Sequence, residues 1–307
     1  MERTEHLATG LDGTRIAWSE AGSGAPPVVL TDGIGCAGFI WRHLQLELAR
    51  SHRVVHWNYR GHGRSEPPRD PERVTVGDCV DDLLAVLEAA GVERAILAGH
   101  SMGVQVCLEA HRREPRRVAG LLLVCGSYGH PIDTFHDSPT LKIALPFARA
   151  AVERWPGLAR LAFRMLVPTE IALQYALAFE VDRRFVPRED VERYLADLAA
   201  IDPLLFVRML TAASGHDAYD HLSRVDVPTL VVAGEKDTFT PMWLSVRMHR
   251  AIPGSELLVL PGGTHVGPLE HPELVGLGVQ KFLRDHFGEG EPGDVAPSRR
   301  AAVRGTR

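Results

Sequence analysis

The amino-acid sequence predicts an α/β protein with a mostly parallel central sheet, helices on both faces of that sheet and an inserted helical region. Three observations lead to this prediction. Up to about residue 126, short apolar runs of strand length alternate with helix-like segments. Between residues 138 and 224 helix-like blocks follow one another, and from residue 228 the alternation resumes. Strands that alternate with helices form parallel sheets, because each helix carries the chain back across a face of the sheet.

The N-terminal part contains the first elements of this sheet. Residues 10–14 predict a turn and residues 15–20 a short alternating strand, the opening of a hairpin. Continuous apolar runs are typical of strands that are covered on both faces. Three such runs lie at residues 27–31, 95–98 and 121–124, and residues 54–57 predict another strand. Helical patterns lie at residues 41–50, at residues 78–90 and directly after Ser101.

The second half predicts an insertion and then the end of the sheet. Helix-like blocks in the insertion include residues 141–151, 171–179, 191–199 and 204–213. After them come strands at residues 228–234 and 256–260 and helices at residues 244–251 and 274–287. We therefore expect a core formed by residues 1–126 and 226–287, a helical cap or lid over residues 127–225, and a disordered tail at residues 288–307, which has no periodicity.

Composition limits the possible functions. Of 307 residues, 45% are hydrophobic and 24% are charged, which is ordinary for a globular protein with one large core. The net charge of −5 is mild, and no run of Lys or Arg alternates with aromatic residues. Nucleic acid is therefore excluded as a partner. We expect a small-molecule substrate and allow for a homo-oligomer.

The cysteines and the apolar segments give further expectations. Cys36, Cys79, Cys107 and Cys125 are dispersed, with no C-x-x-C pair and no His/Cys cluster at metal-ligand spacing, so they predict buried or partly buried thiols, no metal and no cofactor. The N-terminus is charged, and the longest apolar stretch is far shorter than the ~20 residues that cross a bilayer. We expect no membrane span and a cytoplasmic location.

The most informative segment contains Gly99, His100, Ser101, Met102 and Gly103, which lie between an apolar strand and a helix. A serine at such a tight turn adopts an unusual backbone conformation that projects its hydroxyl away from the sheet, and the glycines avoid Cβ clashes. A G-x-S-x-G string also occurs by chance, and Ser101 alone could be an ordinary turn serine. Its place between strand and helix favours a nucleophile.

Two further loops follow predicted strands and carry the groups that a serine nucleophile needs. Asp237 follows the strand at 228–234, and His265 follows the strand at 256–260. Ligands of parallel sheets bind at the carboxyl ends of the strands, where these loops meet. A histidine can act as general base for a serine when an acceptor holds its other nitrogen. The alternatives that the sequence leaves open are Asp220 and Asp226 for the acid and His271 for the base.

The glycine-rich loop at residues 32–35 follows another predicted strand. It could place the backbone N–H of Ile34 near the N–H of Met102. Two such donors stabilise the negative charge that develops on a carbonyl oxygen under attack. Ile34 and Met102 are therefore the expected oxyanion donors.

Together these segments resemble the α/β-hydrolase fold superfamily, in its serine-nucleophile branch with a helical cap, which is esterase- or lipase-like. The resemblance extends over about residues 8 to 287. Its matching segments are residues 27–35, 58–65 (similar to the R-G-x-G-x-S segment of the family), 99–103, 234–241 and 262–265. The resemblance implies that Ser101, His265 and Asp237 form a catalytic triad.

Two positions depart from the family pattern. Asp32 stands where most relatives have His before the glycine of the oxyanion loop, and we expect its carboxylate to turn away from the site and bind backbone N–H groups. Asn58 stands where relatives often have Asp, a change expected to affect only loop anchoring. Residues 60–65 are interpreted as a structural turn. A serine in the turn, in place of Asp, disfavours the branches that attack with a carboxylate.

The aromatic and Met side chains of the insertion, such as Phe163, Met165, Tyr175 and Phe179, are expected mostly to pack inside the cap, with a few lining an apolar pocket. The first functional hypothesis is hydrolysis of a carboxylic ester with an apolar group through an acyl-enzyme. The second is hydrolysis of a carbon–carbon bond in a ring-cleavage product, which polar cap residues near Ser101 would favour. The third is a ligand-binding or receptor-type protein with little turnover.

Overall fold

The computed structural model describes residues 4–134, 136, 138–177, 181–182 and 184–288, and its centre is one eight-stranded sheet. The strand order is β1-β2-β4-β3-β5-β6-β7-β8. β1 and β2 pair antiparallel, β2 pairs antiparallel with β4, and the remaining pairs are parallel. The strands are β1 Thr4–Thr9, β2 Arg15–Ala21, β3 Val28–Thr31, β4 Val54–Trp57, β5 Ala95–His100, β6 Val118–Val124, β7 Thr229–Gly234 and β8 Glu256–Leu260.

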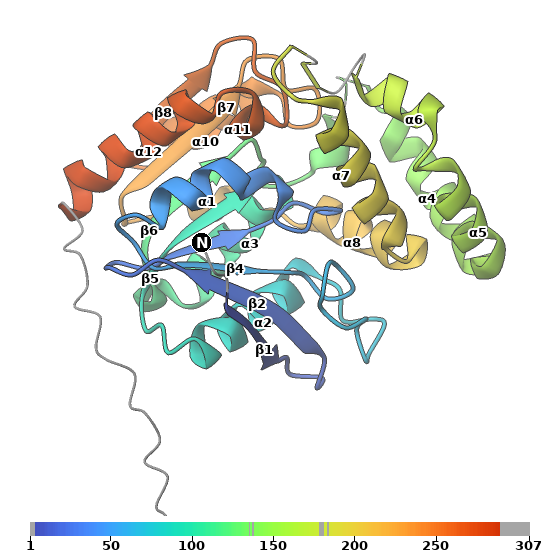
Figure 1. Ribbon diagram of the computed structural model, residues 1–307, viewed down its shortest axis with the longest axis horizontal. Helices are drawn as coiled ribbons and strands as arrows, with labels where there is room; N and C mark the ends of the chain where they lie inside the picture. The colour runs from blue at the N-terminus through green and yellow to red at the C-terminus, as the bar shows by residue number, and fades with distance from the viewer. Residues whose placement is uncertain (1–3, 135, 137, 178–180, 183, 289–307) are drawn as a thin grey trace, which may run out of the picture.

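Helices cover both faces of this sheet (Figure 1). The helices outside the insertion are α1 Arg42–Leu48, α2 Val76–Ala89, α3 Met102–Arg113, α10 Met242–Ala251, α11 Gly267–Glu270 and α12 Pro272–Phe287. Buried side chains of α2, α3 and α10 belong to one hydrophobic cluster, and those of α1 and α12 belong to a second. The predicted α/β class, with a mostly parallel sheet covered on both faces, is confirmed.

The apolar central strands contribute to both clusters. Leu121 and Leu123 of β6 lie in the cluster with α3, whereas Leu122 and Val124 lie in the cluster with α12. Successive side chains of a strand point to opposite faces of the sheet, so a strand between two helical layers must be apolar at every position. This requirement explains why β3, β5, β6 and β7 appear in the sequence as unbroken apolar runs.

The insertion lies between β6 and β7 and contains helices α4 Thr140–Arg154, α5 Pro156–Leu166, α6 Glu170–Tyr175, α7 Arg188–Ala200, α8 Pro203–Gly215 and α9 Tyr219–Leu222. In Figure 1, α4, α5 and α6 form the outer layer, beyond α7 and α8. α4 and α5 each contact α8, which packs against α2. α8 therefore connects the outer helices to the core. The exact limits of the core and cap, 1–126 with 226–287 and 127–225, stay a prediction, and all but the first residue of the expected tail lies outside the described residues.

Several element boundaries differ from the sequence expectation for local reasons. α2 begins at Val76, two residues early, because Thr75 and Asp78 form a capping box in which each side chain accepts from the other's backbone N–H. α5 was not singled out by the helical pattern because it opens with Pro156 and Gly157, although proline is well tolerated in the first turn of a helix. None of the helices in the described ranges is long and apolar enough to span a bilayer.

The turn at residues 60–65 is held by buried polar contacts. The Arg60 guanidinium donates two hydrogen bonds to the Asp82 carboxylate, at 2.8 and 2.7 Å, and both side chains are buried. Ser65 Oγ donates to the carbonyl of Asn58, and Asn58 Oδ1 accepts from the N–H of Arg64. These contacts agree with a structural turn that anchors the loop after β4.

Replacing Arg60 by Ala should lower the free energy of unfolding by about 3–5 kcal/mol, because the Asp82 carboxylate would remain buried without its partner. Urea denaturation followed by circular dichroism measures the change. Arg64→Ala is the matched control, since that side chain is exposed four residues away and should alter stability by less than about 1 kcal/mol. Equal losses in the two variants would contradict a structural role for the buried pair.

Candidate active site

Ser101 occupies the turn between β5 and α3 in a strained backbone conformation, with φ 54° and ψ −118°. Its glycine neighbours permit this turn. A Cβ on Gly99 would lie 2.2 Å from the carbonyl oxygen of Gly103, and a Cβ on Gly103 would lie 2.5 Å from that of Thr31. The close approach of α3 to β3 and β5 therefore requires glycine at both positions.

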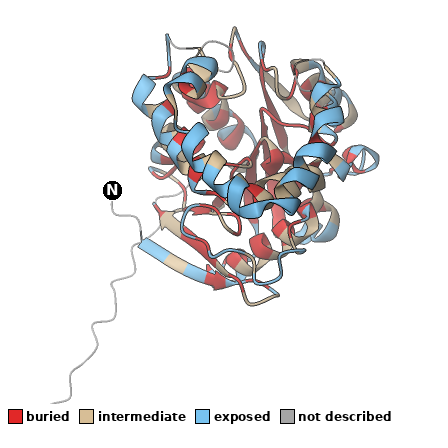
Figure 2. Ribbon diagram, turned by 90° about the vertical axis from the view of Figure 1, so that its right-hand side faces the viewer, coloured by how far each residue is buried: buried red, intermediate tan, exposed pale blue. Residues whose placement is uncertain are grey.

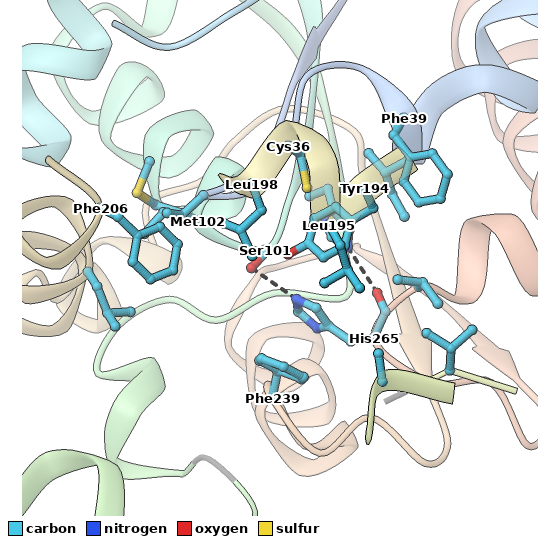
Figure 3. Close-up of a pocket in the computed structure, with 18 of the residues that line it drawn as sticks. Cys36, Phe39, Ser101, Met102, Tyr194, Leu195, Leu198, Phe206, Phe239 and His265 are labelled. Carbon is cyan, nitrogen blue, oxygen red and sulfur yellow. Dashed lines mark hydrogen bonds between the residues drawn. The ribbon is translucent and has the colours of Figure 1, made fainter. Parts of the chain in front are cut away.

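His265 lies beside Ser101 and joins it to Asp237. The Ser101 hydroxyl and His265 Nε2 are 3.0 Å apart (Figure 3), and His265 Nδ1 is 2.9 Å from Asp237 Oδ2. A carboxylate can only accept hydrogen bonds, so Nδ1 carries the hydrogen and Nε2 is the free acceptor for the serine hydroxyl. The three residues form one hydrogen-bonded series across the ends of β5, β7 and β8.

The Asp237 side chain is buried and fixed by its own loop. Its Oδ1 accepts from the backbone N–H groups of Phe239 and Thr240, at 2.9 and 2.8 Å, and its Oδ2 accepts from the Thr240 hydroxyl. The Phe239 ring stacks on the His265 ring with centroids 4.8 Å apart. These contacts set the orientation of both partners.

The alternative acids and base lie elsewhere. Asp226 contacts His111 at 3.1 Å, and Asp220 accepts from Arg112 at 2.6 Å. The His271 ring lies 5.4 Å from that of Phe185. Of the candidate groups, the structure brings Asp237 and His265 to Ser101.

The loop after β3 is held by side chains from β4 and the loop that follows it. The Asp32 Oδ2 atom accepts from the N–H of Gly38 at 2.9 Å and from His56 Nε2 at 2.8 Å. The Tyr59 hydroxyl donates to the Asp32 carbonyl, and His62 Nε2 accepts from the N–H of Gly35. The expectation that Asp32 turns to backbone N–H groups is correct, while its pairing with His56 was not foreseen.

His100 is a further residue of the site that the sequence did not single out. Its buried ring donates from Nε2 to the carbonyl oxygen of His265 at 2.9 Å, and its centroid lies 4.9 Å from that of His265. Burial, with the nearby His265 as a second cause, lowers the pKa of His100 to about 4. The ring is therefore neutral at physiological pH and fixes the backbone that carries His265.

A cavity of about 860 Å³ opens above Ser101 and His265. Its walls come from the loops of the core and from the insertion, and they are overwhelmingly apolar, as with Phe206 and Leu195 in Figure 3. Ile34 and Met102, the expected oxyanion donors, both line it. Among the described residues no Lys, Arg, Asp or Glu side chain lines it. The cavity thus fits an apolar ligand.

The cysteines and the aromatic residues of the insertion can now be placed. All four cysteines are free and buried, as predicted, and burial raises the pKa of Cys36, which lines the cavity, so its thiol does not ionise near neutral pH. Tyr175 lines the cavity, and Phe163 packs against Phe206. Met165 was expected inside the cap, which is wrong: it lies on the outward side of α5 and is 63% exposed. Phe179 lies outside the described residues.

The described residues contain no group of three or more His, Cys, Asp and Glu side chains that could hold a metal ion. Ser101, His265 and Asp237 form the hydrogen-bonded arrangement of the site. What it can do is activate a hydroxyl for attack, because a base, its orienting carboxylate and an adjacent apolar cavity are in place.

Residues 26–272 match the family model described as alpha/beta hydrolase fold, and the chain belongs to that family. It is a hydrolase, as several of the similar proteins are. A putative carbamate hydrolase from Klebsiella pneumoniae is 28% identical over 79% of this chain and 85% of its own length. A 2-hydroxy-6-oxononadienedioate/2-hydroxy-6-oxononatrienedioate hydrolase from Cupriavidus pinatubonensis is 26% identical over 91% and 95%. A solved thermophilic esterase from Thermogutta terrifontis is 26% identical, with a TM-score of 0.75 over 93% of this chain and 100% of that one.

The low pKa of His100 makes stability depend on pH. At pH above 6.5 the ring is neutral in the folded and the unfolded chain, whereas between about pH 6.5 and 4 the unfolded chain alone binds the proton. The free energy of unfolding should therefore fall as the pH falls through this window, by about 1.4 kcal/mol for each unit of pKa difference. Urea denaturation at a series of pH values measures the slope.

The His100→Asn variant is compared with the wild type over the same pH range. The substitution removes the titration of His100, while the other buried histidines, such as His62, are present in both proteins. The variant should lose less stability than the wild type between pH 6.5 and 4. Parallel curves for the two proteins would show that His100 ionises as it does in the unfolded chain.

Proposed function

We propose that this protein is a serine hydrolase that cleaves carboxylic esters carrying an apolar group through an acyl-enzyme intermediate. The observation that carries the proposal is the 3.0 Å contact of Ser101 with His265 at the floor of a large apolar cavity. An ester carbonyl seated on Ser101 would have its apolar part surrounded by the cavity wall. Burial of that part supplies binding energy of about 25 cal/mol per Å² of apolar surface.

In the first half of the reaction, Ser101 Oγ attacks the ester carbonyl carbon while His265 Nε2 takes the hydroxyl proton. The Asp237 carboxylate holds Nδ1–H and stabilises the imidazolium that forms. The tetrahedral intermediate then collapses, and His265 gives its proton to the departing alkoxide. The products of this half are an alcohol and an ester of Ser101.

In the second half, His265 takes a proton from water, whose oxygen attacks the acyl carbon of the Ser101 ester. Collapse of the second tetrahedral intermediate returns the proton to Ser101 and releases a carboxylic acid. In both halves the N–H groups of Ile34 and Met102 are proposed to donate to the oxyanion, a role supported by their position in the cavity lining beside Ser101. No cofactor enters either half.

Carbon–carbon bond hydrolysis is the alternative with the same nucleophile. The name of the Cupriavidus relative describes a substrate with two carboxylates. Carboxylates are usually bound by Arg or Lys, neither of which lines this cavity among the described residues. The apolar lining thus favours an ester over a dicarboxylate ring-cleavage product.

Turnover of p-nitrophenyl esters from acetate to dodecanoate tests the proposal. Ser101→Ala should lower kcat/KM by at least about three orders of magnitude and abolish labelling by a fluorophosphonate probe, because the nucleophile is gone. Ser255→Ala is the control, since that hydroxyl hydrogen-bonds to His249 outside the cavity. Ester turnover that survives in the Ser101→Ala variant would overturn the proposal, and labelling without turnover would favour carbon–carbon hydrolysis.

The contacts of Asp32 predict a separate effect on the oxyanion loop. Asp32→Ala removes the acceptor for the Gly38 N–H and for His56, so the loop that carries Ile34 should shift. We expect kcat to fall at least about tenfold with little change in KM, because donors displaced by a fraction of an ångström lose transition-state stabilisation first. Asp32→Asn keeps an acceptor oxygen and should retain most of the activity. A raised KM at constant kcat would assign Asp32 to substrate binding instead.

A further inference from the structure

Two of the outer helices of the insertion, α4 and α5, expose large apolar side chains away from the cavity. Six of these side chains are between 56% and 73% exposed, and none of them lines the cavity. They are Ile143, Phe147, Trp155, Leu158, Leu161 and Met165. Their apolar surface therefore faces the outside of the molecule. We call the outward faces of α4 and α5, residues 140–166, the α4–α5 surface.

The positions of these side chains follow helical spacing. Ile143 and Phe147 are four residues apart on α4, on the side opposite the buried Leu145. Leu158, Leu161 and Met165 are three and four residues apart along one side of α5. α4 and α5 pack against each other and against α8, so their free sides are neighbours. Figure 2 looks onto this end of the molecule, where exposed helices lie in front.

Basic side chains accompany the apolar ones. Residues 140–166 contain five basic residues and a single acid, Glu153, in a chain whose net charge is −5. Lys142 and Arg160 pair with Asp133 and Asp202, which come from outside these two helices. No ion pair joins Arg154 or Arg164 to a carboxylate of the described residues. A positive excess therefore remains on the α4–α5 surface after local pairing.

The α4–α5 surface is continuous with the wall of the cavity. Leu141, near the start of α4, and Leu166, at the end of α5, both line the cavity. Leu166 directly follows the outward Met165. An apolar molecule that reaches this surface is thus already beside the wall of the proposed substrate site.

We infer that the α4–α5 surface binds to anionic lipid surfaces, such as a membrane or an emulsion of apolar esters that contains acidic lipids. Exposed apolar side chains flanked by Lys and Arg are what a helix needs to lie in the interface of an anionic bilayer, with its apolar side among the acyl chains. A second copy of this chain fits less well, because a two-fold contact would place two positively charged surfaces against each other.

Binding to vesicles tests the inference independently of catalysis, since the full chain with Ser101→Ala binds without turning over lipid. Vesicles of phosphatidylcholine alone are compared with vesicles that contain about 30% phosphatidylglycerol. We expect at least about tenfold tighter binding to the anionic vesicles, with the preference weakening as salt rises because exposed charges are screened.

The variant Phe147→Glu with Leu161→Glu should lower binding to anionic vesicles at least about tenfold. Both side chains point outward, so the folded state should be retained. The matched control is Leu277→Glu. Leu277 is a 65% exposed apolar residue on α12, outside the insertion, so its replacement should leave vesicle binding unchanged.

Three results would overturn the inference. The first is that the protein binds to neither kind of vesicle. The second is that the double variant binds as tightly as the wild type. The third is that the Leu277→Glu control loses as much vesicle binding as the double variant. A dimer seen by sedimentation that the double variant abolishes, without vesicle binding by the wild type, would assign the surface to a second copy. Loss of ester turnover in the soluble assay would bear on the proposed function alone.

Discussion

The structure depends on the close approach of backbone segments around Ser101. α3 can begin immediately after β5 only if the chain reverses within one residue, and that reversal needs the positive φ of Ser101. The carbonyl oxygens of Thr31 and Gly103 occupy the space that side chains at 103 and 99 would take. The turn therefore requires β3, β5 and α3 to pack backbone against backbone, with no side chain at positions 99 and 103. The loops that carry His265, Asp237 and Ile34 leave the sheet at the same edge, so the position of this turn fixes what can surround the serine hydroxyl.

Much of the fold and of the site could be predicted because their signals are local. Each apolar run that became a strand is bounded by turns, and the loops with Asp237 and His265 follow such runs. Parallel strands end at one edge of a sheet, which is why three residues spread over a span of 164 positions in the sequence could be expected to meet. The turn at Arg60 was likewise interpretable, since its glycines open no helix and form no phosphate-binding loop.

The remainder depended on pairings between elements. His56 faces Asp32 because β3 and β4 pair with Leu30 opposite His56, which places Asp32 two residues beyond the paired position. Without the register of β3 and β4, nothing in the sequence indicates that His56 and Asp32 are in contact. His100 was overlooked for a different reason: the G-x-S-x-G motif specifies no residue type at its position, and only the three-dimensional structure shows its hydrogen bond to the His265 carbonyl. Met165 was misplaced because residue type alone does not predict burial: an apolar residue on a helix can face the interior or the solvent.

The insertion is attached to the core very unevenly. α7 and α8 bury several side chains, such as Leu195 and Met209, in the two hydrophobic clusters, whereas α4 buries Leu145 and no residue of α5 is fully buried. Substitutions in α4 and α5 therefore remove few buried contacts, whereas substitutions in α8 disturb the hydrophobic cluster that contains Met209. For an evolving lineage or a combinatorial library, α4 and α5 are therefore the helices of the insertion that can be substituted most freely. New recognition properties can be introduced there while the hydroxyl, the imidazole and the carboxylate stay where the sheet holds them.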